Sequence, residues 1–274
     1  MGARTNDWHP AAAYLYALTL DGPALAWEYL RRNPHYRAAY GRHAGGSVDE
    51  AAHAALWSLR LLEDPVRDAR DAQPAWLPDP DGLPQLHPDA AAAAAASDAP
   101  VFALWRMPGR KQLAHDGQRL LLTAYRPEGT LRTAFSPTLE HGMAYAHGVA
   151  SGARLRERWR AAAGTMERLD AFYGRDAARP GVYASAYAHA HGRPDRIALV
   201  HMRSLQTLDG LAAGATQREI AQAMFGTAVV AERWHDLGEL RAQVRRLARR
   251  GQALVDGGYR RLLQIEAGRD GRLT

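Results

Sequence analysis

Arginine side chains cluster in one segment near the C-terminal end of the chain. In ELRAQVRRLARRGQALVDGG, residues 239–258, they alternate with apolar residues so that the two kinds fall on opposite faces of a helix. A guanidinium group binds phosphate oxygens, or the O6 and N7 atoms of guanine, through two parallel N–H groups. These residues could therefore bind an anion such as nucleic acid, although an ordinary solvated basic face is the alternative. The arginines are Arg241, Arg245, Arg246, Arg249 and Arg250, with Arg260 and Arg261 after the two glycines that stop the helix.

A second candidate site is the start of the helix predicted in GATQREIAQAMFG, residues 214–226. Thr216 is a suitable N-cap, and Glu219 stands three residues on, which is the spacing of a capping box. The first N–H groups of a helix lack partners within it, and with the helix dipole they favour phosphate. We therefore expect Thr216, Gln217 and Arg218 to anchor a nucleic-acid backbone.

The order of elements around these residues is typical of a helix-turn-helix-like DNA-binding unit, here assigned to residues 183–274. A helix ends near Gly214, a tight turn follows, and the short capped helix packs inward through Ile220 and Met224. A simple helix-turn-helix joins its last two helices by three or four residues, whereas here the twelve residues 227–238 intervene. Either VVAERW within them supplies an inserted helical turn, or the basic helix does not read the groove in the usual way. Plain packing of the short helix is the alternative.

Residues 1–88 predict a small acidic helical domain. Residues 1–90 contain 8 Lys and Arg against 12 Asp and Glu, a net charge of −4. Asp21 is placed to cap a helix that begins at Pro23, and a second helix fits residues 48–62. The aromatic side chains of this region could stack on bases, but the acidic balance favours a core or a protein-contact surface. They are Trp8, Tyr14, Tyr16, Trp27, Tyr29, Tyr36 and Tyr40.

An alanine run within residues 89–98 predicts a linker or a short exposed helix, and with it a domain boundary. In residues 99–182, the stretches VFALWRM, RLLLTAYR, TLRTAF and MAYAHGV have the length and composition of strands. HDGQ and PEGT suit tight turns, so we expect a central antiparallel β meander. An amphipathic helix follows, whose apolar stripe serves either the core or self-association. The stripe is Leu155, Trp159, Ala162, Met166, Leu169 and Tyr173.

Composition and charge exclude several classes of protein. The 274 residues include no cysteine, which excludes disulfides and thiolate metal sites and fits a reducing cytoplasm. No apolar run reaches the roughly 20 residues of a membrane span, and the N-terminal residues lack the apolar core of a signal peptide. We expect a cytoplasmic protein with no membrane partner. The net charge is +6, and its positive balance lies wholly beyond residue 90, which suggests an anionic partner unless it merely reflects an arginine-rich composition.

The sequence offers little for catalysis. It contains no glycine-rich phosphate loop, no G-x-S-x-G elbow and no H-E-x-x-H motif. His141 and His147 flank a predicted strand, and His189 and His191 are spaced to share a metal, but no neighbouring carboxylate completes a ligand set. The prediction is a protein that is not an enzyme and has no catalytic residue, metal or cofactor.

Both ends of the chain resemble known regulators. LDGLAAGATQREIAQAMFG, then ERW, then LRAQVRRLARRGQALVDGGYRRLL resembles the C-terminal domain of the RovC-like transcription factors, formerly a domain of unknown function. WEYLRRNPHYRAAY and WSLRLLEDP resemble the small domain that precedes it in FseA-like activators of excision in integrative and conjugative elements. The resemblance implies a bacterial transcription activator of mobile-element or secretion-system genes that forms oligomers. It gives no base-contacting residues, so the arginines above rest on helix projection.

We therefore predict an α+β, mostly helical protein that regulates transcription by binding double-stranded promoter DNA. A homo-oligomer is expected, with RNA polymerase or a regulatory protein as a further partner. Activation rather than repression rests on the resemblance alone. The alternative is a protein-interaction adaptor whose basic helix binds an acidic partner, and a metal-dependent enzyme acting on DNA ranks below it.

Overall fold

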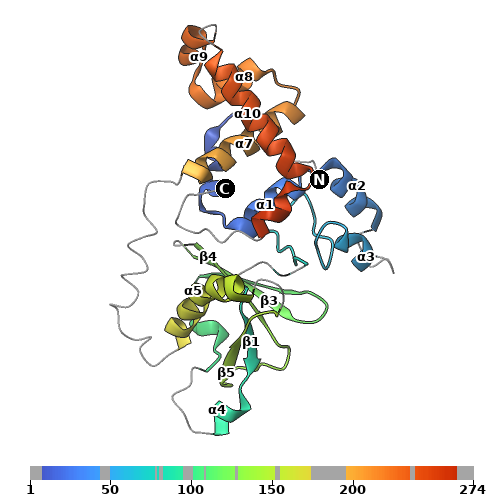
Figure 1. Cartoon of the computed structure of the whole chain (residues 1–274), viewed down its shortest axis with the longest axis vertical. Helices are drawn as coiled ribbons and strands as arrows, with labels where there is room; N and C mark the ends of the chain where they lie inside the picture. The colour runs from blue at the N-terminus through green and yellow to red at the C-terminus, as the bar shows by residue number, and fades with distance from the viewer. Residues whose placement is uncertain are drawn as a thin grey trace. The chain divides into compact units, whose positions relative to one another are not determined.

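The computed structural model describes residues 8–43, 50–77, 79, 83–94, 101–107, 109–126, 129–151, 155–173, 196–234 and 238–263. The chain forms two compact units, which are described separately (Figure 1). The first contains Met1–Ala38, Pro65–Arg70 and Arg193–Leu262, and the second contains Ala39–Asp64, Asp71–Gly192 and Leu263–Thr274. Helices dominate and one unit holds a sheet, so the predicted α+β, mostly helical class is confirmed.

Helices make up the first unit. They are η1 (Ala11–Thr19), α1 (Gly22–Leu30), the start of α2 (Pro34–His43), α7 (Arg196–Ala212), α8 (Gln217–Phe225), α9 (Thr227–Arg233), α10 (Glu239–Val255) and most of η4 (Gly258–Leu263). The Asp21 carboxylate accepts a hydrogen bond from the Ala24 N–H at 2.9 Å and so caps α1, as the sequence predicts.

Glycines in the left-handed region separate the C-terminal helices. Gly214, Gly226 and Gly238 have φ angles of +82°, +90° and +63°, which a residue with a β-carbon rarely adopts. Gly226 alone connects α8 to α9. The intervening residues 227–238 therefore contain a full extra helix, α9, in the place where VVAERW suggested one.

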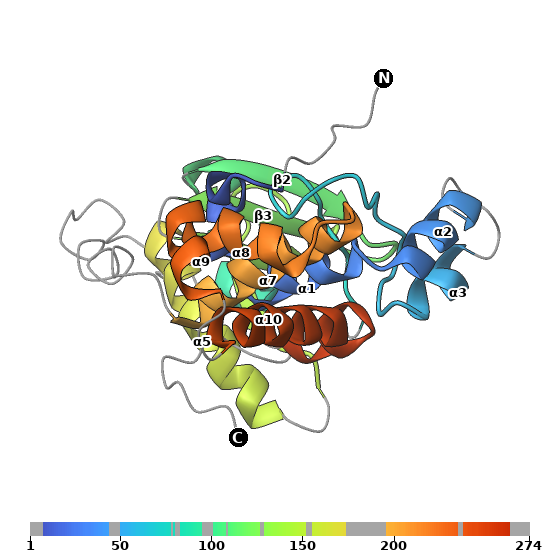
Figure 2. The same cartoon turned by 90° about the horizontal axis from the view of Figure 1, so that it is seen from above.

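α8, α9 and α10 pack around a shared core that also takes in a tryptophan from the N-terminal segment. Its members include Trp8, Ile220, Ala221, Val230, Trp234, Leu240 and Val244. α7 crosses α10 where a β-carbon added to Gly251 would lie 2.9 Å from Leu208 Cγ, so the two helices approach closely at a glycine. Figure 2 shows α7 and α8 next to α10, in agreement with their contacts.

A mixed sheet forms the centre of the second unit. In the described part of the chain its strand order is β2-β3-β4-β1-β5. The strands are β1 (Gln85–Pro88), β2 (Arg110–His115), β3 (Leu120–Arg126), β4 (Gly129–Phe135) and β5 (Tyr145–Gly148). β2, β3 and β4 form an antiparallel meander, as expected, and β3 and β4 are two of its predicted strands. β5, predicted in MAYAHGV, pairs instead with β1, which runs antiparallel to it and parallel to β4.

The apolar stripe of α5 (Leu155–Tyr173) divides between core and surface. Met166 is buried, and Leu169 belongs to the core that lies against the sheet. Leu155 and Trp159 are 41% and 45% exposed. Core packing therefore accounts for the later turns of the helix, and self-association through the first turns stays a prediction. The Tyr173 side chain lies outside the described residues.

Two expectations about local structure in the second unit are wrong. The helix expected at 48–62 is α3 (Glu50–Ala55), because Ser58 adopts φ +62° and Leu59 forms a bridge with Trp76. VFALWRM is not a strand: η2 (Leu104–Arg106) occupies its centre, and the strand that pairs with β3 is β2, which follows it. The alanine run forms the short helix α4 (Ala90–Ala94), one of the two alternatives expected.

The compact units divide the chain differently from the predicted sequential domains. β1 precedes the predicted linker at 89–98, yet it lies between β4 and β5, which follow the linker. Residues 8–37 belong to the same unit as α7 and α10. Long-range pairing and packing cause both differences. None of the described helices is long and apolar enough to cross a lipid bilayer.

Candidate nucleic-acid interface

α10 separates its apolar and basic residues onto opposite faces. Leu240, Val244, Leu247, Gly251, Leu254 and Val255 are buried. Arg241, Arg245, Arg246, Arg249 and Arg250 are all exposed. The three-to-four spacing of the apolar residues produces this division, because they form one stripe along the helix. The exposed face is a row of planar donors that suits phosphate or carboxylate oxygens.

An open groove joins α10 to the start of α8. Gln217 of α8 and three arginines of α10, Arg245, Arg246 and Arg249, line it together with two small residues of α10, Ala242 and Ala248. The structure thus brings two separate parts of the predicted site onto one concave surface. All of its charged lining residues are basic, so the groove favours an anionic partner.

The start of α8 has the predicted capping box. The Thr216 hydroxyl oxygen accepts a hydrogen bond from the Glu219 N–H at 3.3 Å, and Glu219 Oε2 accepts from the Thr216 N–H at 2.7 Å. The Thr216 N–H and hydroxyl lower the pKa of Glu219 below its ordinary value. Because Glu219 and Thr216 satisfy each other, the N–H groups of the first helical residues, Gln217 and Arg218, are the ones that helix geometry offers to an anion. Arg218 is exposed and Gln217 is half-buried in the groove.

Arg241 lies against the core at the beginning of α10. Its guanidinium carbon is 5.6 Å from the centroid of the Trp234 ring, a cation–π distance, and Trp234 is buried among α8, α9 and α10. Arg233 at the end of α9 pairs with Glu239 at 2.9 Å. These contacts tie the end of α9 to the first turns of α10.

The remaining predicted arginines lie away from the groove lining. Arg250 acts electrostatically on two buried residues, Tyr29 and His201. Burial raises the pKa of Tyr29, and the positive charge of Arg250 opposes this rise. Burial and Arg250 both lower the pKa of His201, to about 4. Arg260 of η4 stacks over the Tyr259 ring at 4.9 Å, and Arg261 is exposed. Of the predicted set, the groove lining therefore contains Gln217, Arg245, Arg246 and Arg249, and it does not contain Thr216, Arg218, Arg241, Arg250, Arg260 or Arg261.

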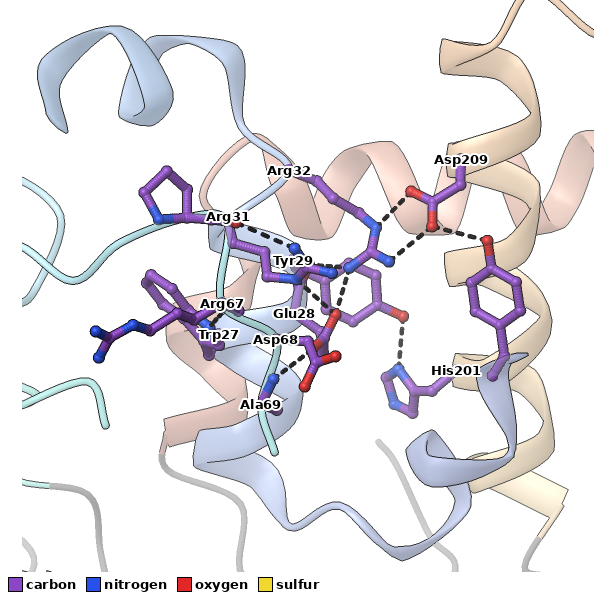
Figure 3. Close-up of polar contacts among 12 residues, drawn as sticks. Trp27, Glu28, Tyr29, Arg31, Arg32, Arg67, Asp68, Ala69, His201 and Asp209 are labelled. Carbon is purple, nitrogen blue, oxygen red and sulfur yellow. Dashed lines mark hydrogen bonds and ion pairs between the residues drawn. The ribbon is translucent and has the colours of Figure 1, made fainter. Parts of the chain in front are cut away.

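A buried polar network underlies the first unit (Figure 3). Arg32 binds both carboxylate oxygens of Asp209 on α7, at 2.8 Å each, and also ion-pairs with Glu28 one turn back on α1. Glu28 is fully buried and accepts a further hydrogen bond from the Ala69 N–H at 2.7 Å, while Asp209 accepts from the Tyr14 hydroxyl at 2.8 Å. The network thus links η1, α1, the 65–70 segment and α7.

The charges in this network stabilise one another. Burial alone would raise the pKa of Glu28 and of Asp209, but the nearby Arg32 guanidinium, with the hydrogen bonds, holds both below their ordinary values. The Tyr29 hydroxyl and His201 Nδ1 form a second buried pair, 2.8 Å apart, between α1 and α7. Sequence reasoning missed the charged residues and His201, and it singled out Tyr14 and Tyr29 only as aromatic residues of a core or protein-contact surface. The sequence signal for them was an acidic residue among apolar ones, Glu28 in AWEYL and Asp209 in LQTLDGL, because a buried carboxylate requires a positively charged partner.

Family models match three parts of the chain. Residues 149–264 match a family described as "T6SS, Transcription factor, DNA binding domain", and residues 7–60 match a "Proteobacterial transcriptional regulator-like domain". Residues 81–131 match a "Domain of unknown function (DUF7011)". A search of curated proteins found no match. The first match contains α8, α10 and every predicted site residue. Together the first two descriptions support a DNA-binding transcriptional regulator.

Of the histidines considered as metal ligands, His141 and His147 lie within the described residues. Within the described ranges, no three His, Asp or Glu side chains lie close enough together to hold a metal ion. The ring of His147 packs edge-on against Tyr145, with centroids 5.3 Å apart. His189 and His191 lie outside the described residues, so their predicted spacing is not tested.

Proposed function

We propose that the protein is a sequence-specific transcription regulator that binds double-stranded promoter DNA through the groove between α8 and α10. The observation that carries the proposal is the groove itself. It combines Gln217 at a helix start with three exposed arginines of α10, inside the residues that match a DNA-binding family.

The proposed contacts follow from the chemistry of each group. The arginines of α10 hold phosphates and read guanine edges, since a major groove about 12 Å wide admits a helix. Gln217 and Arg218 anchor the backbone at the start of α8, where the helix dipole favours phosphate, and Thr216 contributes by holding this helix start in its capping box with Glu219. Arg260 and Arg261, just past α10, extend the basic surface. With α9 inserted, α8 and α10 serve as the two helices of a helix-turn-helix-like unit with a longer connection.

We further propose that the regulator is an activator in the cytoplasm. The resemblance to RovC-like and FseA-like proteins supports secretion-system or mobile-element genes as targets, and the matched family carries T6SS in its description. Activation requires contact with RNA polymerase or a regulatory protein. The exposed Leu155 and Trp159 of α5 support a contact with a second copy of the chain.

The second candidate is an adaptor whose basic face binds an acidic protein. The exposed arginines of α10 support it as well, because a carboxylate accepts the same pair of N–H donors as a phosphate. The two functions differ in which feature of the ligand determines its affinity for the basic face. A DNA reader distinguishes sequences, whereas an adaptor responds to carboxylate density.

Binding to three probes separates the candidates. The purified chain is titrated, at fixed salt, with the duplex upstream of its own operon, with a duplex of the same composition but shuffled sequence, and with polyglutamate. Tighter binding to the upstream duplex than to both other probes supports the regulator. Binding to polyglutamate as tight as to either duplex, without preference between the duplexes, would favour the adaptor and overturn the proposal.

A further inference from the structure

Two consecutive residues in the turn between α1 and α2, Arg32 and Asn33, form hydrogen bonds with α7 and α10, the two helices whose crossing supports the candidate interface. Arg32 grips Asp209 of α7 with its Nε and Nη2 atoms and donates from Nη1 to the Glu28 carbonyl at 2.7 Å. Asn33 is buried and donates from Nδ2 to the Val255 carbonyl, in the last turn of α10, at 3.0 Å. A single short segment is thereby bonded to both α7 and α10.

The crossing of α7 and α10 lies between these two attachments. Leu208, the neighbour of Asp209, packs directly on Gly251, four residues before Val255. Close packing transmits small displacements instead of absorbing them. A shift of α7 at Asp209 is therefore passed to α10, and a shift at Val255 acts on α10 directly.

Arg32 and Asn33, with their hydrogen bonds to α7 and α10, are called the clamp below. Asn33 is itself held in place by α2. Its Oδ1 accepts hydrogen bonds from the His35 and Tyr36 N–H groups, at 2.8 and 3.1 Å, and so caps α2. Both ends of the amide are thus satisfied, and the side chain has one orientation. The Arg32 guanidinium likewise donates to two carboxylates, that of the buried Glu28 and that of the half-buried Asp209, which fixes its plane.

From these contacts we propose that Arg32 and Asn33 are positioning residues of the DNA-binding surface. The part of the regulator-like match that belongs to the first unit, residues 8–38, is then a structural part of that surface and not of a separate domain. It sets the direction of α10 relative to the start of α8, and hence which arginines reach phosphates together. The inference rests on the proposed DNA binding for its functional half.

Two conservative variants of the full chain test the clamp. Asn33→Asp keeps the Oδ1 cap of α2 but replaces the donor to Val255 with an oxygen that repels the carbonyl. Arg32→Lys keeps the charge but loses the two-pronged grip on Asp209. Two control variants match them. Ala38→Asp adds the same negative charge at an exposed position of α2, and Arg70→Lys changes an exposed arginine that pairs with Asp68.

Two measurements are made on each variant, below its unfolding temperature. Hydrogen exchange of the free protein reports the protection of the α10 amides. Binding to the duplex upstream of its own operon, across a salt series, reports how many phosphates are contacted. We expect faster exchange in α10 and affinity about 2- to 30-fold weaker for both test variants. The salt slope becomes shallower by about 1 for each arginine that no longer reaches a phosphate. The controls behave like the parent chain.

The outcomes separate the clamp from the proposed function. Unchanged α10 exchange, or an unchanged affinity and slope of the folded protein, overturns the positioning role. A lowered thermal stability with unchanged affinity also overturns it, because Arg32 and Asn33 would then be purely structural. A third outcome is that the parent chain binds no duplex while hydrogen exchange in α10 rises in the test variants. The proposed function then fails, and with it the proposal that Arg32 and Asn33 affect DNA binding. The physical coupling of these two residues to α10 is still supported.

Discussion

Replacing Gly251 with alanine sets helix propensity against packing. In an open helix position the change stabilises by about 1 kcal/mol, because alanine loses less backbone entropy than glycine. Here the new carbon would lie 2.9, 3.0 and 3.2 Å from Cγ, Cδ1 and Cδ2 of Leu208. The nearest of these is the branch point of the side chain and not its flexible end. Overpacking of this kind costs roughly 1–3 kcal/mol, and three close contacts favour the upper half of that range. We therefore expect Gly251→Ala to lower the free energy of unfolding by about 1–2 kcal/mol.

Gly164→Ala provides the matched control. Gly164 is in the interior of α5, and a β-carbon there meets nothing within 4 Å. Propensity acts alone at this position, so the variant should gain up to about 1 kcal/mol. Urea unfolding followed by tryptophan fluorescence and by circular dichroism measures both variants, with each transition fitted separately. Stabilisation by Gly251→Ala comparable to that of the control would refute the tight crossing of α7 and α10.

Three further predictions concern caps and titration. Thr216→Ala should cost about 1 kcal/mol of stability by removing the cap of α8. Thr227→Ala should cost little, because Thr227 is the first residue of α9 and the N-cap position of that helix is Gly226; thermal unfolding compares the two variants. His201 is buried neutral with its pKa lowered to about 4, so the free energy of unfolding should fall by up to about 1.4 kcal/mol per pH unit as pH drops from about 6.5 towards 4, and His201→Gln should remove that dependence. Glu28 and Asp209 have lowered pKa values, so their ionised forms stabilise the folded state above the ordinary carboxyl pKa near 4, and this stabilisation is lost as the pH falls further. When unfolding is measured between neutral and acid pH, the free energy of unfolding of Asp209→Asn should fall less steeply than that of the parent chain. An identical pH dependence for the two chains would contradict the network.

The features of the candidate interface that depend on residues close together in the sequence could be predicted from the sequence alone. The capping box at Thr216 and the division of α10 into two faces depend on residues three or four positions apart, and both are present. Asp21 caps α1 for the same reason. Such features need no knowledge of the rest of the fold, because the helix itself brings the residues together.

Features that depend on distant partners could not be read in this way. The Arg32–Asp209 pair joins residues 177 positions apart, and Asn33 reaches Val255 over 222 positions. β1 lies between β4 and β5 although the alanine run separates it from both in sequence. The strand β2 was missed because RKQLAH lacks a clear apolar alternation, and its pairing with β3 supplies what its own sequence does not. The predicted helix at 48–62 is too long because no feature of the local sequence indicates that Ser58 adopts a left-handed conformation.

The salt dependence of duplex binding tests the central claim most directly. The parent chain, Arg245→Ala/Arg249→Ala and the control Arg42→Ala/Arg106→Ala are titrated with the duplex upstream of the operon at several salt concentrations. The control removes the same charge from exposed positions on α2 and η2. The proposal predicts weaker binding by the α10 variant and a salt slope shallower by about 2, with the control close to the parent chain. Equal affinities and slopes for the two double variants would show that the arginines of α10 do not contact DNA.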